Sequence, residues 1–172
     1  MKRTEKTNQL QRIAALLVFA AIEASAQDDK STRRIVVSIP DRKLVLLEGV
    51  RILKVYDVAV GKPSTPSPRG EFTIVARVPN PTWKNVAPGP DNPVGTRWLG
   101  LSAKGYGIHG TNAPGSIGKA ASHGCIRMRN HDIEELFELV RAGISVELAG
   151  ERPEVIARIL ADQNPQNNQK GE

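Results

Sequence analysis

The stretch IHGTNAPGSIGKAASHGCIRM, residues 108–128, is the most informative part of this chain for its fold and chemistry. It holds the single cysteine of the sequence, Cys125, and two of the three histidines, His109 and His123. Cys125 follows His109 by 16 positions (125 − 109), across a loop-like run rich in Gly, Ser, Ala, Asn and Pro. A thiol becomes an effective nucleophile when an imidazole within hydrogen-bond reach takes its proton. The stretch therefore predicts two rigid elements that bring a cysteine and a histidine together, with a loop between them for a substrate.

The immediate neighbours of Cys125 favour a reactive thiol over a structural one. Gly124 has no side chain next to the sulfur, so a substrate backbone can approach closely. Ser122, His123 and Arg127 place polar and cationic groups around it, and such groups favour the thiolate. A lone cysteine is often a small buried hydrophobe instead, but the neighbours here are mostly polar.

Two other uses of these side chains have to be weighed. His109, His123 and Cys125 could supply three zinc ligands, but no second cysteine and no helical histidine pair supports that site. A serine nucleophile is the other alternative, because Ser116 and Lys119 match the bare Ser-x-x-Lys pattern. That match lacks the Ser-Asp-Asn and Lys-Thr-Gly partners of such serine enzymes. We therefore expect Cys125 to be the nucleophile, with no metal and no cofactor.

Two motifs in this stretch resemble the active-site signature of the L,D-transpeptidases with a YkuD-type catalytic domain. They are His109-Gly110-Thr111 and Ser122-His123-Gly124-Cys125-Ile126-Arg127-Met128. The resemblance extends over about residues 35–148 and includes the segments TPSPRGEF (65–72), PNPTW (79–83) and GPDNPVGTRWLGL (89–101). It implies a cysteine enzyme of cell-wall biogenesis and cell shape that acts on peptidoglycan and is inhibited by carbapenems.

The resemblance also implies a role for each reacting group. His109 is the general base, and the backbone carbonyl of Gly110 orients its ring as the third member of a triad. Cys125 attacks the carbonyl between the third and fourth residues of a tetrapeptide stem, and the terminal D-alanine leaves. An amine of another stem, or a lysine of an envelope protein, then takes the acyl group.

Two alternatives to transfer stay open. Water as the acceptor would make the chain a carboxypeptidase, or a hydrolase that releases a wall-attached protein, with the same residues. A non-catalytic protein could bind peptidoglycan through the same cleft, although simple binding has no need of a thiol. The sequence does not identify the acceptor.

The remaining candidates surround the nucleophile. Backbone N–H groups from His123 through Gly124 to the cysteine are expected to form the oxyanion hole. Ser122 and His123 shape the pocket. Arg127 pairs with a substrate carboxylate or forms a structural ion pair. Trp83 lies in a long proline-rich loop, residues 79–96, which would wall the cleft, and it contacts substrate or anchors packing.

The first 26 residues have the composition of a secretory signal peptide. A basic start with Lys2 and Arg3 is followed by the apolar run 13–22 and by the small-residue site Ala24-Ser25-Ala26. That run is short for a bilayer span, so we expect no stable membrane anchor. We assign 1–26 to a signal peptide, 27–33 to a linker, 34–150 to the catalytic domain and 151–172 to a C-terminal helix and disordered tail. Export implies a periplasmic or cell-envelope protein, in which a single cysteine cannot form an internal disulfide.

The charge of the chain is that of an ordinary solvated surface. The formal charge is +6, and the first 26 residues contribute four basic and two acidic side chains, which leaves about +4 (6 − 2). Aromatic residues are 4% of the chain, too few for a base-stacking platform, and no nucleic-acid motif is present. The expected partners are peptidoglycan peptide stems and a wall-attached protein, and not nucleic acid.

Runs rich in Val, Ile and Leu predict strands on both sides of the site. They cover residues 35–39, 43–48, 50–60 and 71–78, with shorter strands at 98–101, 107–108 and 145–148. In the third run, alternation puts Val50, Ile52, Tyr56, Val58 and Val60 on one face.

One amphipathic helix follows the active stretch. Ile133, Leu136, Phe137 and Val140 fall at i, i+3, i+4 and i+7, with Asn130 as the expected N-cap. Gly143 is the expected C-terminal stop, and residues 153–160 predict a further short helix. The pattern alone indicates a single, mostly-β domain. The resemblance refines this to a β-sandwich or open barrel of the YkuD type with one main α-helix.

Overall fold

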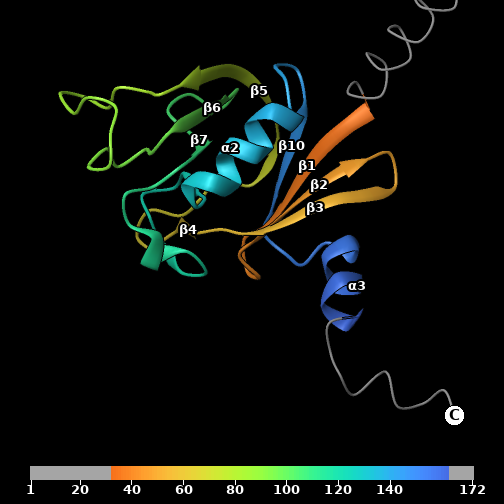
Figure 1. Ribbon diagram of the computed structural model, residues 1–172. Coiled ribbons are helices and arrows are strands. Elements are labelled where there is room, and N and C mark those ends of the chain that lie inside the picture. The colour runs from red at the N-terminus through yellow and green to blue at the C-terminus, as the bar shows by residue number, and fades with distance from the viewer. Residues whose placement is uncertain (1–31, 163–172) are drawn as a thin grey trace, which may run out of the picture. The chain divides into compact units, whose positions relative to one another are not determined.

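Eight strands of the described residues form one curled, mostly antiparallel sheet, and two further strands form a small parallel pair. The computed structural model describes residues 32–162 (Figure 1). The strands are β1 (Arg33–Ser38), β2 (Lys43–Glu48), β3 (Arg51–Asp57), β4 (Val60–Gly61), β5 (Gly70–Pro79), β6 (Arg97–Leu101), β7 (Gly107–His109), β8 (Ala120–Ser122), β9 (Ile126–Arg127) and β10 (Ser145–Ala149). The helices are α2 (Asn130–Leu139) and α3 (Glu154–Asp162), and a short 3₁₀ turn, η2, spans Pro114–Ser116. The order of the large sheet is β3-β2-β1-β10-β5-β6-β7-β9, which confirms the mostly-β prediction.

Strands β1 and β2 are apolar on both faces because both faces are covered. Successive residues of a strand point to opposite sides, so each side receives every second residue. The main core takes Ile35, Val37, Leu44 and Leu46, whereas Val36, Val45 and Leu47 pack against α3. An uninterrupted apolar run is the signature of a strand buried on both sides. The sequence pattern thus predicted the strands correctly.

The face predicted for the third run is partly wrong. The register between β2 and β3 shifts at Leu46 and Leu47, which face Lys54 and Ile52, so one residue of β3 is bulged. A bulge exchanges the two faces of the strand on its far side. Val50 lies in the turn before β3 with 99% of its surface exposed, and Ile52 is also exposed. Tyr56, Val58 and Val60, which follow the bulge, are all buried in the main core, so only this part of the predicted face is confirmed.

Helix α2 has the predicted apolar stripe. It lies in front of the middle of the sheet in Figure 1, next to β6 and β7, and buries Ile133, Leu136 and Phe137 in the main core. Burying a side chain of this size stabilises the fold by about 1.5–3 kcal/mol relative to leaving it in water. The helix is therefore fixed to the strands that carry the site.

Both predicted ends of α2 are corrected by the structure. Arg129 occupies the N-cap position, with no side-chain capping bond, and Asn130 is the first helical residue. The Oδ1 atom of Asn130 instead accepts a hydrogen bond from the backbone N–H of Thr111, at 3.1 Å. At the other end the helix stops at Leu139, and Gly143 lies in the following turn with a φ of 89°.

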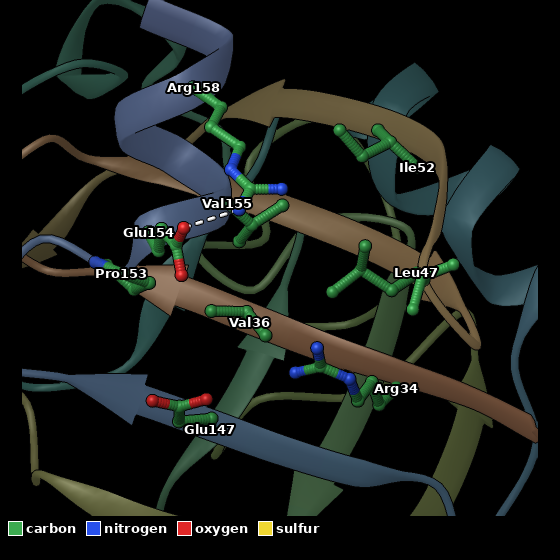
Figure 2. Close-up of a pocket in the computed structure, with 10 residues that line it drawn as sticks. Arg34, Val36, Leu47, Ile52, Glu147, Pro153, Glu154, Val155 and Arg158 are labelled. Carbon is green, nitrogen blue, oxygen red and sulfur yellow. Dashed lines mark hydrogen bonds and ion pairs between the residues drawn. The ribbon is translucent and has the colours of Figure 1, made fainter.

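Helix α3 confirms the predicted C-terminal helix and covers the other face of β1 and β2. Figure 2 shows Val155 of this helix above Val36 and Leu47. The three side chains line a groove of about 410 Å³. Ile156 is fully buried against the same strands. Before the helix, the Arg152 guanidinium donates two hydrogen bonds to one oxygen of Asp41, at 2.9 and 2.6 Å.

The long loop between β5 and β6 is held by one buried side chain. The Nδ2 atom of Asn92 donates to the carbonyl of Pro81 at 2.7 Å, and its Oδ1 accepts from the N–H of Val94 at 3.0 Å. These bonds order a segment that has little secondary structure of its own. Within the loop, Trp83 and Val86 exchange two backbone hydrogen bonds, which fix the backbone at Trp83.

Three predictions concern residues outside the described range of 32–162. The signal peptide, most of the linker and the disordered tail belong there. Within residues 32–162, no helix has the length and apolar character needed to cross a membrane.

Candidate active site

His109 is the last residue of β7 and is held both through its backbone and through its ring. Its backbone carbonyl accepts from the N–H of Met128 at 2.8 Å. Its ring stacks on Trp98 of the neighbouring strand β6, with centroids 5.4 Å apart and planes 16° from parallel. The register pairs Trp98 directly with His109, which places the two rings on the same face. The residue is 5% exposed, so its ring has little freedom to reorient.

The ring nitrogens of His109 have distinct roles. Nδ1 lies 2.5 Å from the backbone carbonyl oxygen of Gly110. A carbonyl can only accept, so Nδ1 carries the proton and Nε2 keeps its lone pair. Burial lowers the pKa of His109 to about 4, and Arg127 also lowers it, against an opposing contribution from the Gly110 carbonyl. At neutral pH the ring is therefore neutral, in the tautomer that a general base requires.

Cys125 sits in a tight turn built by Ser122. The Ser122 hydroxyl donates to the carbonyl of Cys125 at 2.6 Å and accepts from the N–H of Gly124 at 3.0 Å. Gly124 has a φ of 115°, and a Cβ there would lie 2.6 Å from the Tyr106 ring. Glycine is required because no other residue tolerates both the conformation and the contact. The Cys125 thiol donates a long hydrogen bond to the carbonyl of Gly105, with the sulfur 3.8 Å from the oxygen.

The expectation that the surroundings of Cys125 favour its thiolate is corrected. Burial raises the pKa of the Cys125 thiol, because a charged sulfur loses its hydration there. The backbone amide of Gly107 and the guanidinium of Arg127 lower it by less than burial raises it. The resting pair is accordingly a neutral thiol and a neutral imidazole.

One cavity of about 530 Å³ brings most of the predicted residues together. It is lined by Trp83, Lys84, Pro93, Val94, Trp98, Gly105, His109, Ser122, His123, Cys125 and Arg127. His109 comes from β7, Cys125 from the turn before β9, and β7 pairs with β9 in parallel. Two elements far apart in sequence thus deliver the two side chains to one place. Within residues 32–162 no hydrogen bond directly joins His109 to Cys125.

The other predicted residues are placed as follows. His123 is exposed at the cavity, whereas Ser122 and Gly124 are buried in the turn beneath it. Trp83 is 38% exposed, lines the cavity and stacks on Trp98 with ring centroids 6.2 Å apart, which supports its packing role, whereas its contact with substrate stays a prediction. Ser116, the alternative nucleophile, is not among the lining residues, and its hydroxyl donates to the carbonyl of Ala113 at 2.7 Å.

Two of the cavity residues that the sequence analysis did not single out change the description of the site. Trp98 was treated as part of a strand, but it forms the middle of a stack that runs from Trp83 to His109. Its ring lies over Gly100 and Gly107, where a Cβ would approach the indole to 3.0 and 2.7 Å. Glycines at these two positions beside a strand tryptophan were the available signal.

The second missed residue, Lys84, changes the charge of the cavity. It has a φ of 51° in the turn after Trp83 and lines the cavity together with Arg127. The lining contains no Asp or Glu from the described part of the chain. Two cations without a carboxylate favour an anionic group on whatever binds there. Over residues 32–162, no three or more His, Cys, Asp or Glu side chains group as metal ligands would.

Fold and cavity define a mostly-β protein in which a buried neutral histidine and a cysteine share one cavity. Residues 32–148 match the family model of the YkuD-type L,D-transpeptidase catalytic domain. A Bacillus licheniformis relative that carries the name L,D-transpeptidase YkuD is 51% identical over 115 residues, 67% of this chain and 64% of that protein. The Bacillus subtilis relative YqjB, also named for this activity, is 41% identical over 120 residues, 65% of this chain and 68% of that protein. The chain therefore belongs to the L,D-transpeptidase family with a YkuD-type catalytic domain.

Solved structures agree with this fold. The catalytic domain of the Enterococcus faecium L,D-transpeptidase is 27% identical with a TM-score of 0.57, over 68% of this chain and 96% of that one. The Ldtfm–avibactam carbamoyl enzyme is 27% identical with a TM-score of 0.61, over 70% of this chain and 50% of that one. This chain spans less than two thirds of the length of the two Bacillus relatives named YkuD, 64% of the Bacillus licheniformis protein and 63% of the Bacillus subtilis protein.

Proposed function

We propose that this protein is a cysteine L,D-transpeptidase of the cell envelope that acts on tetrapeptide stems of peptidoglycan. The observation that carries the proposal is the pairing, in one cavity, of Cys125 with a neutral His109 whose Nδ1–H is fixed by Gly110. Membership of the family supports the reaction class. A thiol, a base with a free lone pair and an orienting acceptor are the parts that acyl transfer needs.

The chemistry begins from the neutral pair. Nε2 of His109 takes the thiol proton as the sulfur of Cys125 attacks the carbonyl between the third and fourth residues of the stem. The imidazolium then gives that proton to the departing nitrogen, and D-alanine leaves. An amine of a second stem, or a protein lysine, attacks the thioester while His109 takes its proton, and the thiol is restored. Because the thiol is protonated at rest, proton transfer accompanies the attack.

The oxyanion formed during attack needs backbone donors. The amide of Gly124 already donates to the Ser122 hydroxyl. We therefore assign the oxyanion hole to the backbone amides of His123 and Cys125 and remove Gly124 from the three amides that the sequence predicted. Each well-placed donor in such a hole is worth roughly 10²–10³ in rate.

The charged lining suits a donor stem with a free carboxylate. Arg127 and Lys84 both line the cavity, and in the described residues no ion pair joins Arg127 to a carboxylate. This favours the predicted substrate contact of Arg127 over a structural ion pair. A guanidinium can bind a carboxylate through two parallel hydrogen bonds.

A carbapenem tests the nucleophile directly. Its strained β-lactam carbonyl stands in for the acyl donor, and its carboxylate for the charge of the stem. Intact-protein mass and peptide mapping should find a single adduct on Cys125, absent from Cys125→Ala and retained in the matched control Ser116→Ala. An adduct on Ser116 would contradict the assignment, and no adduct with a reduced thiol would favour a non-catalytic binding protein.

Two substitutions separate the roles of the histidines. His109→Gln should abolish acylation, because the base is lost, while the exposed His123→Gln should keep a measurable rate. The opposite result would show that the two roles have been exchanged. The acceptor is identified by incubating the enzyme with tetrapeptide-containing wall: cross-linked dimers indicate transfer to a stem, tripeptides indicate hydrolysis, and a protein-linked stem indicates attachment.

A further inference from the structure

The peptide unit between Gly110 and Thr111 is hydrogen-bonded at both of its ends. Its carbonyl accepts from Nδ1 of His109, at 2.5 Å. Its N–H donates to Oδ1 of Asn130, at 3.1 Å. The atoms of one peptide unit are coplanar, so fixing the N–H also fixes the direction of the carbonyl. Asn130 is thereby connected to the His109 ring through a single rigid group.

The backbone around Asn130 is shaped to admit its side-chain oxygen. A Cβ added at Gly95 or at Gly110 would lie 2.2 Å from Oδ1 of Asn130. Gly95 also has a φ of 63°, which favours glycine on its own. The segments that contain Gly95 and Gly110 therefore both lack a side chain at the point where the Asn130 side chain lies between them.

Asn130 is also anchored to the most rigid part of the protein. It is the first residue of α2, whose Ile133 and Leu136 are fully buried in the main core. Its side-chain oxygen is directed to the loop that carries Gly110, where it accepts the hydrogen bond from the N–H of Thr111. The hydrogen bond thus ties the acceptor of His109 to the core.

We propose that Asn130 is a positioning residue, which holds the Gly110–Thr111 peptide so that its carbonyl fixes His109 in the Nδ1–H tautomer. Hydrogen bonds in such a chain polarise one another, so the Asn130 bond also makes the Gly110 carbonyl a stronger acceptor. The inference rests on the proposed function of His109 as the general base. It adds a residue that touches neither the substrate nor the thiol.

The test compares Asn130→Ala with Asn130→Asp and with the control Asn112→Ala. Asn130→Asp keeps an oxygen acceptor in place. Asn112 is an exposed amide in the same loop, which donates to the carbonyl of Asp91 and not to the peptide that holds His109. Three quantities are measured for each: the ¹⁵N shifts of the His109 ring, the rate of carbapenem acylation and the melting temperature.

In Asn130→Ala the His109 ring should populate the Nε2–H tautomer, and acylation should slow roughly 10- to 100-fold, as expected for a misplaced catalytic group. Asn130→Asp should restore the Nδ1–H tautomer and most of the rate, and Asn112→Ala should match the wild type. An unchanged tautomer and rate in Asn130→Ala would overturn the proposal, even with a lower melting temperature, because Asn130 would then be a structural tether alone.

If Asn130→Ala fails to fold, Asn130→Asp decides the question at pH 7. A charged acceptor strengthens the bond to the Thr111 amide and, through the peptide, the bond from His109. The resonances of the Thr111 amide proton and of the His109 Nδ1 proton should then both move downfield. Movement of the Thr111 resonance alone would overturn the proposal. The His109 tautomer is measured from the ¹⁵N shifts of its ring, and this measurement does not depend on catalytic activity. Failure of the proposed function, seen as wild-type acylation in His109→Gln, is therefore distinguishable from failure of this inference.

Discussion

The two helices pack against different strands, α2 beside β6 and β7 in the main core and α3 on β1 and β2, and they differ in their connection to the candidate site. α2 packs into the main core and its first residue, Asn130, reaches the loop that orients His109. α3 packs on Val36, Val45 and Leu47, and among the described residues none of its side chains lines the Cys125 cavity. The two helices are of similar length but should have different effects. We expect α3 to contribute only to the stability of the fold, and α2 to contribute both to stability and to the geometry of the site.

The largest expected effect is that of Leu136→Ala in α2. Leu136 is fully buried in the main core, so its truncation should cost about 3–5 kcal/mol in the free energy of unfolding. Because α2 carries Asn130, the carbapenem acylation rate of the remaining folded protein should also fall. Urea unfolding and acylation kinetics, both at 25 °C, measure the two effects. A normal acylation rate would break the proposed link between α2 and the site.

Ile156→Ala in α3 is the matched substitution on the other face. Ile156 is also fully buried, but α3 lies beside an open groove, so the expected cost is about 2–4 kcal/mol. The acylation rate of the folded protein should stay at the wild-type value. A slowed acylation here would mean that both helices support the site, and the contrast between them would be lost.

The third effect is a loss of stability on mild acidification. The pKa of His109 is about 4 in the folded protein against about 6.5 unfolded, so between these values the unfolded chain binds a proton that the folded one does not. The free energy of unfolding should therefore fall by about 2 kcal/mol from pH 7 to pH 5, with no contribution from this group above pH 7. In His109→Gln this part of the slope should vanish. An unchanged slope would contradict the burial of a neutral ring.

The smallest effect is expected for the Arg152–Asp41 pair that precedes α3. Arg152 lowers the pKa of Asp41, chiefly through its hydrogen bonds, so the pair stabilises the fold above the unfolded pKa of Asp41 and is lost as the pH falls through the folded value. The Arg152 side chain is more than half exposed, and ion pairs that reach solvent contribute little. Arg152→Ala should lower the melting temperature at pH 7 by less than Ile156→Ala does, and leave acylation unchanged. A larger drop would mean that the pair, not the apolar contact, holds α3.

The sequence allowed the core of the candidate site to be predicted because its residues lie in one recognisable stretch. His109, Cys125 and Ser122 were identified from their spacing and neighbours, and all three line the cavity. Trp98 and Asn130 were not identified as members of the site. Trp98 reaches His109 through strand pairing, and Asn130 reaches Thr111 across 19 positions of chain. Contacts of this kind depend on register and docking, which local patterns do not specify.

The pKa of the Cys125 thiol likewise could not be predicted from the residues next to it in the sequence. Its neighbours in sequence are polar and cationic, which predicted a stabilised thiolate, yet burial raises the pKa of Cys125. Burial is set by everything that packs around the group, including β7 and the long loop between β5 and β6, and not by the adjacent residues alone.

The sequence by itself therefore determined the mostly-β class, the apolar positions of β1, β2 and α2, and the residue types that meet in the candidate site. These follow from side-chain periodicity and from residue type, which are local properties. The tertiary structure alone decided the bulge that exchanges the two faces of β3 and the stack that runs from Trp83 to His109. It also decided the tautomer and the neutral state of the His109 ring. Each of these depends on the distance between groups that the chain separates and only the packed sheet brings together.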